Sequence, residues 1–293
     1  MDYGICLPNF TPGASSEGID AAAEVAVRLG WSTAWTTDHV LVPQDAADEY
    51  GQNYDAIQTL AWVGGRHAGL RLGTSVIVVP QRNAVVLAKE LATLDSLSGG
   101  RVVAGVGVGW HRGEFANLAM DHRFGVRGAY LDETIALWRH LWSGSSEAFR
   151  GRFHTIEDFV FGPLPEQGAS LPIVVGGRAE AALRRAGTVG DGYHSSASSP
   201  AQYGVRLPLI RAAAEAAGRP LPWLSARVRV EFEESGSGYA MRGSPEAIAA
   251  EVRSFADLGV THLALWFGTT DAEEVVARAE RFAREVAPLI AEA

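Results

Sequence analysis

Short apolar runs alternate along the chain with longer stretches in which apolar residues recur every three or four positions. The short runs are rich in β-branched residues and predict strands buried on both faces, whereas the longer stretches predict helices with one buried side. The predicted strands are Tyr3–Leu7, Thr33–Thr36, Leu72–Val79, Val102–Val106, Pro172–Val175, Asp191–His194, Ala226–Phe232 and Thr261–Phe267. Strands and helices alternate eight times, and this order predicts a (β/α)8 TIM barrel that forms a single domain over residues 1-293.

The stretch from Arg71 to Phe115 shows the pattern of strand, helix and strand most clearly. Asn83 is suited to cap a helix whose buried side carries Leu87, and Gly99 is suited to end that helix. Ligands gather at the carboxyl ends of parallel strands. The residues that follow the two strands of this stretch are therefore expected to form two sides of a pocket.

An open, doubly wound sheet is the alternative that the same alternation allows. Its dinucleotide-binding turn, G-x-G-x-x-G, is absent, because Gly105, Gly107 and Gly109 form G-x-G-x-G instead. These three glycines share one side of the strand end, since alternate residues point to the same face. A row without side chains lets a flat ring lie close to the backbone, and tight packing is the other reason for such a row.

Four segments fall outside the regular alternation and predict loop insertions at the C-terminal face of the barrel. Residues 43–53 are polar and acidic, and their number suggests a loop over the pocket. The segment after Glu114 is expected to be irregular, and residues 151–168 to form a short extended excursion. Residues 233–242 are rich in glycine and serine and are expected to be mobile.

The composition narrows the classes of partner. The chain has 293 residues, is 47% hydrophobic and 20% charged, and carries a net charge of −9. The negative charge argues against nonspecific binding to nucleic acid or to anionic membranes. Cys6 is the only cysteine, which excludes an intramolecular disulfide and a cysteine-rich metal site. Without a signal peptide or a long apolar run, the chain is expected to be cytoplasmic and not membrane-bound. The expected pocket walls at 43–53, 110–124 and 233–243 contain aromatic and apolar residues, which fit a small-molecule substrate more than a sugar phosphate.

Two groups of polar residues next to predicted strands are candidates for chemistry. Gly176, Gly177 and Arg178 open a helix after a buried strand, where free N–H groups and the positive helix end can hold an anion. Asp38 and His39 stand just past the second strand. Histidine titrates near neutral pH, so His39 is a candidate proton carrier. The structural alternatives are a glycine-containing turn and a histidine that satisfies a core carbonyl.

Four phrases of the sequence resemble the bacterial luciferase-like superfamily, and within it the group that uses the deazaflavin coenzyme F-420 (F420). They are TSV at 74–76, LAKELATLDSLSGGR at 87–101, GVGVGW followed by EF at 105–115, and PIVVGGRAEAALRRAGTVGDGY at 172–193. Together with matches elsewhere they extend the resemblance over nearly the whole chain. The resemblance implies the barrel fold and an oxidoreductase that transfers a hydride to or from a small organic substrate.

The resemblance also assigns roles to residues. It implies a non-prolyl cis peptide at Ser75–Val76, or one bond later, against the coenzyme ring. It implies that His39 is catalytic, that Asp38 binds or orients, and that Arg127 is a second candidate for the coenzyme phosphate. Glu114 is expected to be mainly structural. The residues expected to bind the coenzyme are Asp38, His39, Ser75, Val76, Gly107, Gly109, Trp110, Arg127, Gly176, Gly177 and Arg178.

Two other functions fit the same fold. A two-component monooxygenase would use reduced FMN and oxygen, because a flavin has nitrogen where the deazaflavin has carbon. A barrel that binds a flavin-like ligand without turnover is the second alternative. A metal hydrolase or serine hydrolase fits poorly, since H-x-H, H-E-x-x-H and G-x-S-x-G are all absent.

The substrate is not determined by these motifs. Trp110 occupies the position of an acidic residue in the F420-dependent sugar-phosphate dehydrogenases, which puts their acid–base scheme and their substrate in doubt here. His194 and Trp266 end later strands and are expected on the substrate side. A homodimer through the apolar helices at 55–67 and 83–98 is also expected, as in related proteins.

Overall fold

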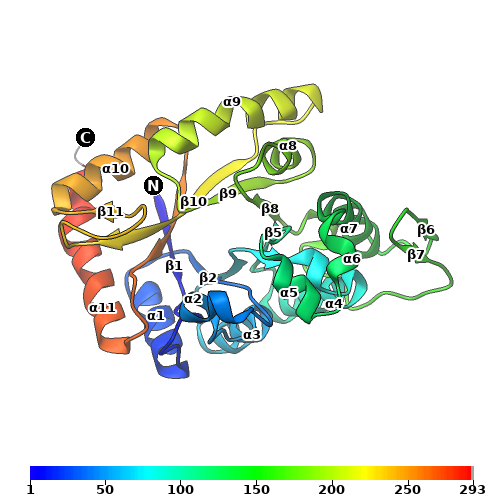
Figure 1. The fold of residues 1–293 in the computed structure, drawn as a ribbon, viewed down its shortest axis with the longest axis horizontal. Coiled ribbons are helices and arrows are strands. Elements are labelled where there is room, and N and C mark those ends of the chain that lie inside the picture. The colour runs from blue at the N-terminus through cyan, green and yellow to red at the C-terminus, as the bar shows by residue number, and fades with distance from the viewer. Residues whose placement is uncertain (292–293) are drawn as a thin grey trace.

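A closed barrel of parallel strands forms the centre of the computed structural model, which describes residues 1–291 (Figure 1). Its strands are β1 (Asp2–Cys6), β2 (Thr33–Thr36), β3 (Arg71–Thr74), β4 (Ile77–Val78), β5 (Val102–Gly107), β8 (Ile173–Gly176), β9 (Gly192–Ser196), β10 (Trp223–Glu231) and β12 (His262–Trp266). Strand β1 pairs with both β2 and β12, and β9 pairs with β10, which closes the ring. Strands β3 and β4 both pair with β5 and share one position. The predicted barrel is confirmed, and the open sheet is wrong.

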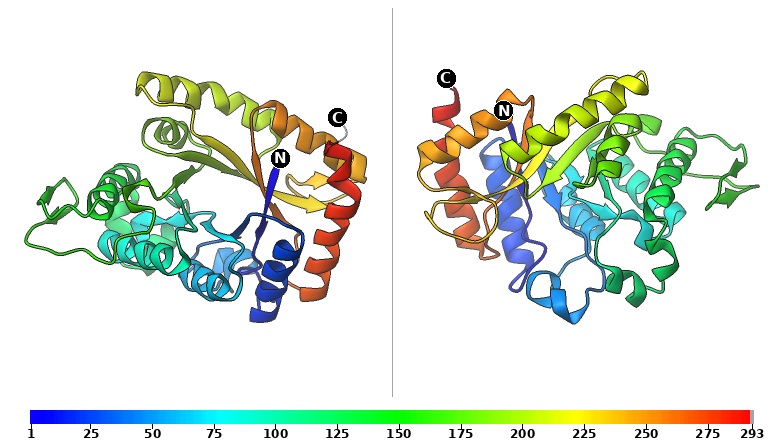
Figure 2. Two further views of the ribbon diagram at one scale, coloured as in Figure 1. Left: turned by 180° about the vertical axis from the view of Figure 1, so that it is seen from behind. Right: turned by 45° about the horizontal axis from the view of Figure 1, so that its top comes forward.

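Helices cover the outside of the barrel (Figures 1 and 2). The longer ones are α1 (Ser16–Arg28), α3 (Ala56–Arg66), α4 (Ala84–Ser98), α7 (Arg127–Trp142), α8 (Glu180–Thr188), α9 (Pro200–Ala216), α10 (Pro245–Asp257) and α11 (Ala272–Arg281). Asn83 caps α4 by accepting from the N–H groups of Val85 and Val86, and Gly99 ends it in the left-handed conformation with φ of 71°. The buried sides of these helices pack on the outward-facing strand residues to form the main core.

The run predicted as one strand at 72–79 is divided in the structure. Strand β3 ends at Thr74 and β4 begins at Ile77, and the bond between Ser75 and Val76 is cis, as the resemblance implied. The side-chain oxygen of Thr74 accepts from the N–H of Gly105 and donates to its carbonyl. Ser75 and Val76 form a bulge that interrupts the backbone hydrogen bonding between the strands. At this point the side chain of Thr74 supplies the hydrogen bonds to the backbone of Gly105.

The insertions contain more regular structure than the sequence predicts. Residues 43–53 hold a 3-10 turn (Gln44–Ala46) and α2 (Ala47–Tyr50), and the segment predicted as irregular holds α5 (Arg112–Asn117) and α6 (Asp121–Phe124). Strands β6 (Phe149–Arg150) and β7 (Thr155–Ile156) form a small hairpin that projects from the barrel (Figure 1). The remaining elements are β11 (Met241–Arg242), 3-10 turns at Val79–Gln81 and Gly168–Ser170, a π-helix at Phe282–Val286, and α12 (Pro288–Ala291).

None of the helices within residues 1–291 has the length and apolar character needed to cross a bilayer.

Candidate active site

A cavity of about 450 Å³ opens at the carboxyl ends of the barrel strands, larger than the other cavities described. Every residue predicted to bind the coenzyme lines it: Asp38, His39, Ser75, Val76, Gly107, Gly109, Trp110, Arg127, Gly176, Gly177 and Arg178. They come together because parallel strands deliver all their carboxyl ends to one face of the barrel. Trp110 lies at the rim and is 63% exposed.

His39 is held by a buried carboxylate. Its Nδ1 lies 3.2 Å from Oε1 of Glu114, and the same oxygen accepts from the N–H of Val40. Burial opposes ionisation of Glu114, but the hydrogen bond and charge of His39, with the bond from Val40, leave the pKa of Glu114 below its ordinary value. Since a carboxylate only accepts, Nδ1 of His39 carries the hydrogen. Its Nε2 makes no hydrogen bond within residues 1–291, so this is the nitrogen free to exchange a proton with a ligand.

Glu114 is therefore more than the structural residue that the sequence suggested. It fixes the tautomer and orientation of the proposed catalytic histidine from 75 residues further along the chain. The ring of Tyr50, on α2, covers the imidazole of His39 with 4.0 Å between the ring centroids. The polar segment over the pocket thus contributes one aromatic wall beside His39.

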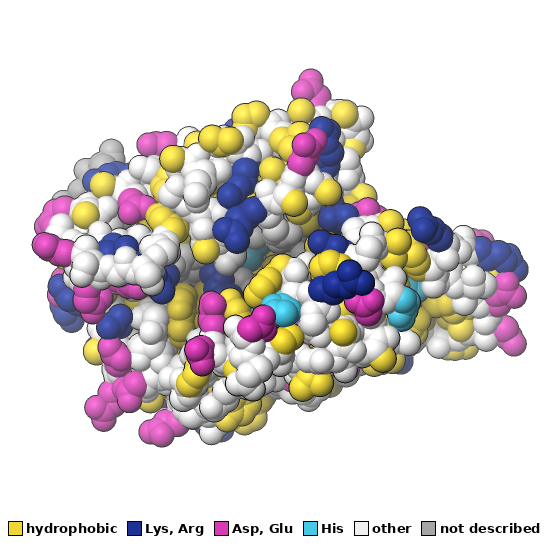
Figure 3. Space-filling view, viewed as in Figure 1, with side chains coloured by type: hydrophobic (Ala, Val, Ile, Leu, Met, Phe, Trp, Pro, Cys, Tyr) yellow, Lys and Arg dark blue, Asp and Glu magenta, His cyan; other side chains and the backbone are white. Residues whose placement is uncertain are grey.

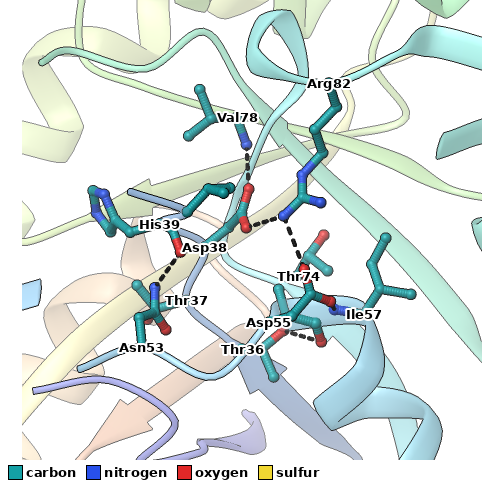
Figure 4. A network of polar contacts seen from close by, with 12 residues as sticks. Thr36, Thr37, Asp38, His39, Asn53, Asp55, Ile57, Thr74, Val78 and Arg82 are labelled. Carbon is teal, nitrogen blue, oxygen red and sulfur yellow. Dashed lines mark hydrogen bonds and ion pairs between the residues drawn. The ribbon is translucent and has the colours of Figure 1, made fainter. Parts of the chain in front are cut away.

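Asp38 faces the other way from its neighbour (Figure 4). One carboxylate oxygen accepts from the N–H of Val78 at 2.9 Å, and the other accepts from Nη2 of Arg82 at 2.5 Å. Arg82 also contacts Asp55, the residue that caps α3. With both oxygens occupied inside the protein, the geometry favours an orienting role for Asp38.

Part of the space beside the glycine row is filled by protein, and part of it is open to the cavity. A Cβ on Gly105 would lie 1.7 Å from the carbonyl oxygen of Thr74, and Gly105 does not line the cavity. A Cβ on Gly107 or Gly176 would meet the side chain of Val76 at 2.6 Å and 2.9 Å respectively. Val76 is thus wedged between two glycines and presents its remaining surface to the cavity. The glycines allow the bulge to approach, which is the packing explanation, and Gly107 adds open backbone to the cavity wall.

A chain of hydrogen bonds beneath the cavity holds Ser75. Ser225 donates to the carbonyl of Tyr193, so its oxygen accepts from Nδ1 of His194 at 2.8 Å, and Ser75 donates to Nε2 of His194 at 2.9 Å. The imidazole of His194 also stacks on Trp35 with 4.4 Å between centroids. His194 is fully buried and is not on the substrate side, which corrects the prediction from the sequence. Trp266 packs on Phe10 and does not line the cavity either.

The buried His194 predicts a specific loss of stability in acid. Burial, with the charges of His262 and Arg227, lowers its pKa to about 3, against about 6.5 in the unfolded chain. Between these values the unfolded state binds a proton that the folded state does not, so stability falls as the pH drops from 6.5. From pH 7 to 4.5, wild-type protein is expected to lose on the order of 2–3 kcal/mol more stability than His194→Asn.

Guanidinium unfolding followed by circular dichroism at several pH values measures this difference. Carboxylates with lowered pKa, such as those of Asp20 and Glu133, destabilise both proteins in acid, so the comparison between the proteins isolates His194. His122→Gln, at an exposed histidine, is the control and is expected to follow wild type. Parallel pH curves for wild type and His194→Asn would contradict the prediction.

The opposite end of the cavity can hold an anion. Gly177 has φ of 120°, and the cap of the following helix α8 at Ala179 makes no side-chain hydrogen bond. Its first N–H groups are therefore available to a ligand. Arg178 is exposed beside them. Arg127 lies over the ring of Phe124 at 4.1 Å, and its buried Nε has no partner within residues 1–291.

Sequence reasoning missed three polar residues of the cavity wall, namely Thr37, Ser196 and Arg227. Thr37 and Ser196 carry no signal in the sequence beyond their positions at strand ends. Arg227 has one: it is a charged residue within an apolar strand, at an alternate position shared with the polar Ser225. That alternation indicates an inward-facing side chain.

Comparisons with known proteins agree with this architecture. The profile described as luciferase-like monooxygenase matches residues 1–233. The F420-dependent glucose-6-phosphate dehydrogenase of Kineococcus radiotolerans is 26% identical over 99% of this chain and 96% of its own. A solved F420-dependent secondary alcohol dehydrogenase, in complex with an F420-acetone adduct, superposes with a TM-score of 0.84 at 17% identity over 99% of this chain and 98% of its own.

An FMN-containing protein also shares the fold. The oxygenating constituent of 3,6-diketocamphane monooxygenase from Pseudomonas putida, solved with FMN, has a TM-score of 0.81 at 14% identity over 99% of this chain and 98% of its own. At these identities the two solved structures show the fold alone.

Proposed function

The chain belongs to the luciferase-like monooxygenase family, and we propose that it is an F420-dependent oxidoreductase that transfers a hydride to or from a small organic substrate. The observation that carries the proposal is one cavity with two ends. One end has the His39–Glu114 pair, and the other has the open helix start beside Arg178. The likeness to an F420-dependent dehydrogenase over nearly the whole of both chains supports the choice of coenzyme.

The residues present fit a deazaflavin. Val76, Gly107 and Gly109 line the cavity and would support the ring, because the two glycines add no side chain to this wall; a Cβ would lie 2.6 Å from Val76 at Gly107 and 2.7 Å from Val78 at Gly109. The N–H groups at the start of α8, with Arg178 and the unpartnered Nε of Arg127, would hold the phosphate. When bound, the coenzyme supplies or accepts a hydride.

The protein's own contribution is proton handling and exclusion of water. Glu114 keeps hydrogen on Nδ1 of His39, so Nε2 gives or takes a proton at the substrate oxygen. Tyr50 covers the imidazole, and Asp38 with Arg82 fixes the strand ends on either side. This arrangement needs no acidic side chain at position 110, where the sugar-phosphate dehydrogenases carry one and this chain has tryptophan.

A fluorescence titration of purified protein with F420 and, separately, with FMN tests the proposal. Tight F420 binding with weak FMN binding is expected. Arg178→Ala is expected to raise the Kd for F420 about tenfold, because it removes one charge-assisted hydrogen bond to the phosphate. Arg184→Ala is the matched control, since Arg184 lies on α8, the helix that follows Arg178, pairs with Glu180 and does not line the cavity.

The other outcomes of the titration separate the alternatives. FMN binding alone would support the monooxygenase, whose fold neighbour holds FMN, and would call for assays with a reductase and oxygen. Binding of neither coenzyme to folded protein would favour a barrel that keeps the family fold without its cofactor.

We further propose that residues 1–293 act as one domain in a cytoplasmic homodimer. Trp62 on α3 and Val86 and Leu97 on α4 are exposed apolar residues on the helices that the sequence indicated for pairing. The mass of the protein in solution, measured by light scattering, tests this association.

A further inference from the structure

Strand β10 sends a row of polar side chains into the mouth of the barrel. Its alternate positions carry Ser225, Arg227, Arg229 and Glu231. The intervening Val228 and Val230 are buried and face the helices. Arg229 pairs with Glu231, and Glu231 also pairs with Arg242. Arg227, one step deeper, forms no ion pair with any residue in 1–291. The strand therefore delivers one uncompensated positive charge to the cavity wall.

The guanidinium of Arg227 is held in a fixed position. Its Nη1 donates to Oγ1 of Thr37 at 2.8 Å and to the carbonyl of Ser75 at 3.2 Å, and its Cζ lies 4.9 Å from the ring centre of Phe10. Both hydrogen bonds use Nη1. The Nη2 and Nε donors have no acceptor among the residues that the structure describes. A guanidinium fixed in plane with two free donors matches the two oxygens of a carboxylate.

Arg227 differs in its contacts from the arginines of the phosphate end. It lies on β10, two strands from β8 and three strands from β2 around the barrel, but its guanidinium reaches across the mouth to Thr37 and Ser75 after β2 and β3. Thr37 is two residues from His39 in sequence, and the side chains of Arg227, Thr37 and His39 line the same cavity. A ligand bound to Arg227 would therefore lie in the cavity that the proposed proton carrier lines.

An aromatic ring and apolar side chains line the cavity near Arg227 and His39. Phe10 is buried behind the lining, where it contacts the guanidinium and stacks with Tyr50 at 6.2 Å between centroids; Tyr50 lines the cavity and covers His39 at 4.0 Å. Tyr50, with the lining residues Val76, Val78 and Val108, suits an apolar or aromatic body next to the charged end of a ligand. They provide no second cation, and a doubly charged phosphate would normally be met by more than one.

The charge of the cavity is opposite to that of the whole protein. The chain has a net charge of −9, but among residues 1–291 the only acidic residue that lines the cavity is Asp38, which is bound to Arg82. The other charged lining residues are Arg127, Arg178 and Arg227. Figure 3 shows Lys and Arg side chains along the central hollow of this face. An unpaired charge on a partly buried wall favours a complementary anion.

We propose that Arg227 is the substrate-specificity residue and binds the carboxylate of a small organic acid with an apolar or aromatic body. The proposal rests on the proposed function, since it names the substrate class of the same cavity. It separates two anion positions in one cavity: the helix start beside Arg178 for the coenzyme phosphate, and Arg227 for the substrate.

Benzoate, phenyl phosphate and benzamide are suitable probes. Their binding to the cofactor-free and to the F420-loaded protein is measured by ligand-observed NMR. Wild type is expected to bind benzoate in both forms, and benzamide at least about tenfold more weakly because it lacks the charge. Arg227→Gln is expected to weaken benzoate about tenfold or more while changing the Kd for F420 less than about threefold. Arg227→Lys keeps the charge but loses the planar fork, so an intermediate affinity is expected.

Two controls locate the effect. Arg229→Gln changes the next inward position of the same strand, whose charge is paired with Glu231, and is expected to leave benzoate binding unchanged. Arg178→Gln is expected to weaken F420 but not benzoate. Thermal unfolding of each variant shows that it is folded, and the Arg227→Lys protein keeps the test valid if Arg227→Gln does not fold.

Three results would overturn the proposal: equal benzoate binding by wild type and Arg227→Gln, tighter binding of phenyl phosphate than of benzoate, or loss of F420 binding in Arg227→Gln with benzoate unaffected. The last result would assign Arg227 to the coenzyme. The cofactor-free arm is independent of F420, so benzoate binding that depends on Arg227 would survive a failure of the proposed coenzyme.

Discussion

Replacing His39 by alanine is expected to lower kcat about 10²–10⁴-fold, the usual contribution of a positioned general acid or base. The Kd for F420 is expected to change less than about threefold, because the phosphate end and the glycine wall are untouched. The physical reason is the geometry of the pair: Glu114 holds Nδ1 of His39, and Nε2, which has no hydrogen bond within residues 1–291, belongs to a side chain that lines the cavity. The change in F420 absorbance, with any small organic substrate that wild type turns over, measures kcat, and fluorescence measures the Kd.

Glu114→Gln separates orientation from proton transfer. The amide keeps the shape of the side chain but lacks the negative charge of the carboxylate, whose pKa His39 helps to hold below its ordinary value and which fixes the imidazole tautomer. A loss of kcat smaller than that of His39→Ala is expected, on the order of tenfold. His122→Ala, at an exposed histidine, is the control with no expected loss. If His39→Ala lost F420 affinity as strongly as turnover, His39 would be a binding residue instead.

Gly105→Ala is expected to destabilise the protein by more than about 3 kcal/mol, a large part of the usual stability of a domain. The new Cβ would lie 1.7 Å from the carbonyl oxygen of Thr74 and 3.3 Å from the side chain of Val76. Neither neighbour can move freely: the side chain of Thr74 is hydrogen-bonded to the N–H and the carbonyl of Gly105 itself, and the side chain of Val76 is packed between Gly107 and Gly176. The clash is relieved only if β3 and β5 move apart at Thr74 and Gly105, and this movement breaks these hydrogen bonds.

Guanidinium unfolding of the purified variant measures the effect, or the yield of folded protein if the variant does not accumulate. Gly65→Ala is the control: no heavy atom lies within 4 Å of its added Cβ on the exposed side of α3. Alanine is the better helix former there, so a gain of about 0.5–1 kcal/mol is expected. A Gly105→Ala protein within about 1 kcal/mol of wild type would show that the bulge can shift at little cost.

Much of the barrel could be read from the sequence because its signals are local. The four residues of β2 are those predicted, and Asn83 and Gly99 bound α4 as expected, since capping depends on residues within one helical turn. The cavity residues could also be predicted as a group. Once the strands are known to be parallel and closed, every residue that follows a strand must meet the others at the same face.

The pairs that give the cavity its chemistry could not be predicted in this way. Glu114 meets His39 across 75 residues, and Arg227 meets Thr37 across 190. No periodicity links such positions, because periodicity reports which face a residue occupies and not which residue it will touch. The glycine row shows the same limit: its spacing predicted an open wall, and the structure packs the Ser75–Val76 bulge against it.

The sequence by itself determined the order of strands and helices, the barrel and the set of residues around its mouth, because these follow from local burial patterns and the parallel connection of the strands. Only the tertiary structure decided which of those residues are neutralised and which are free. Asp38 is bound to Arg82 and His194 is buried under Ser75, whereas Nε2 of His39 and the outer donors of Arg227 remain open to a ligand. The physical reason is that closing the barrel fixes distances between side chains far apart in the chain, and hydrogen bonds and ion pairs depend on those distances.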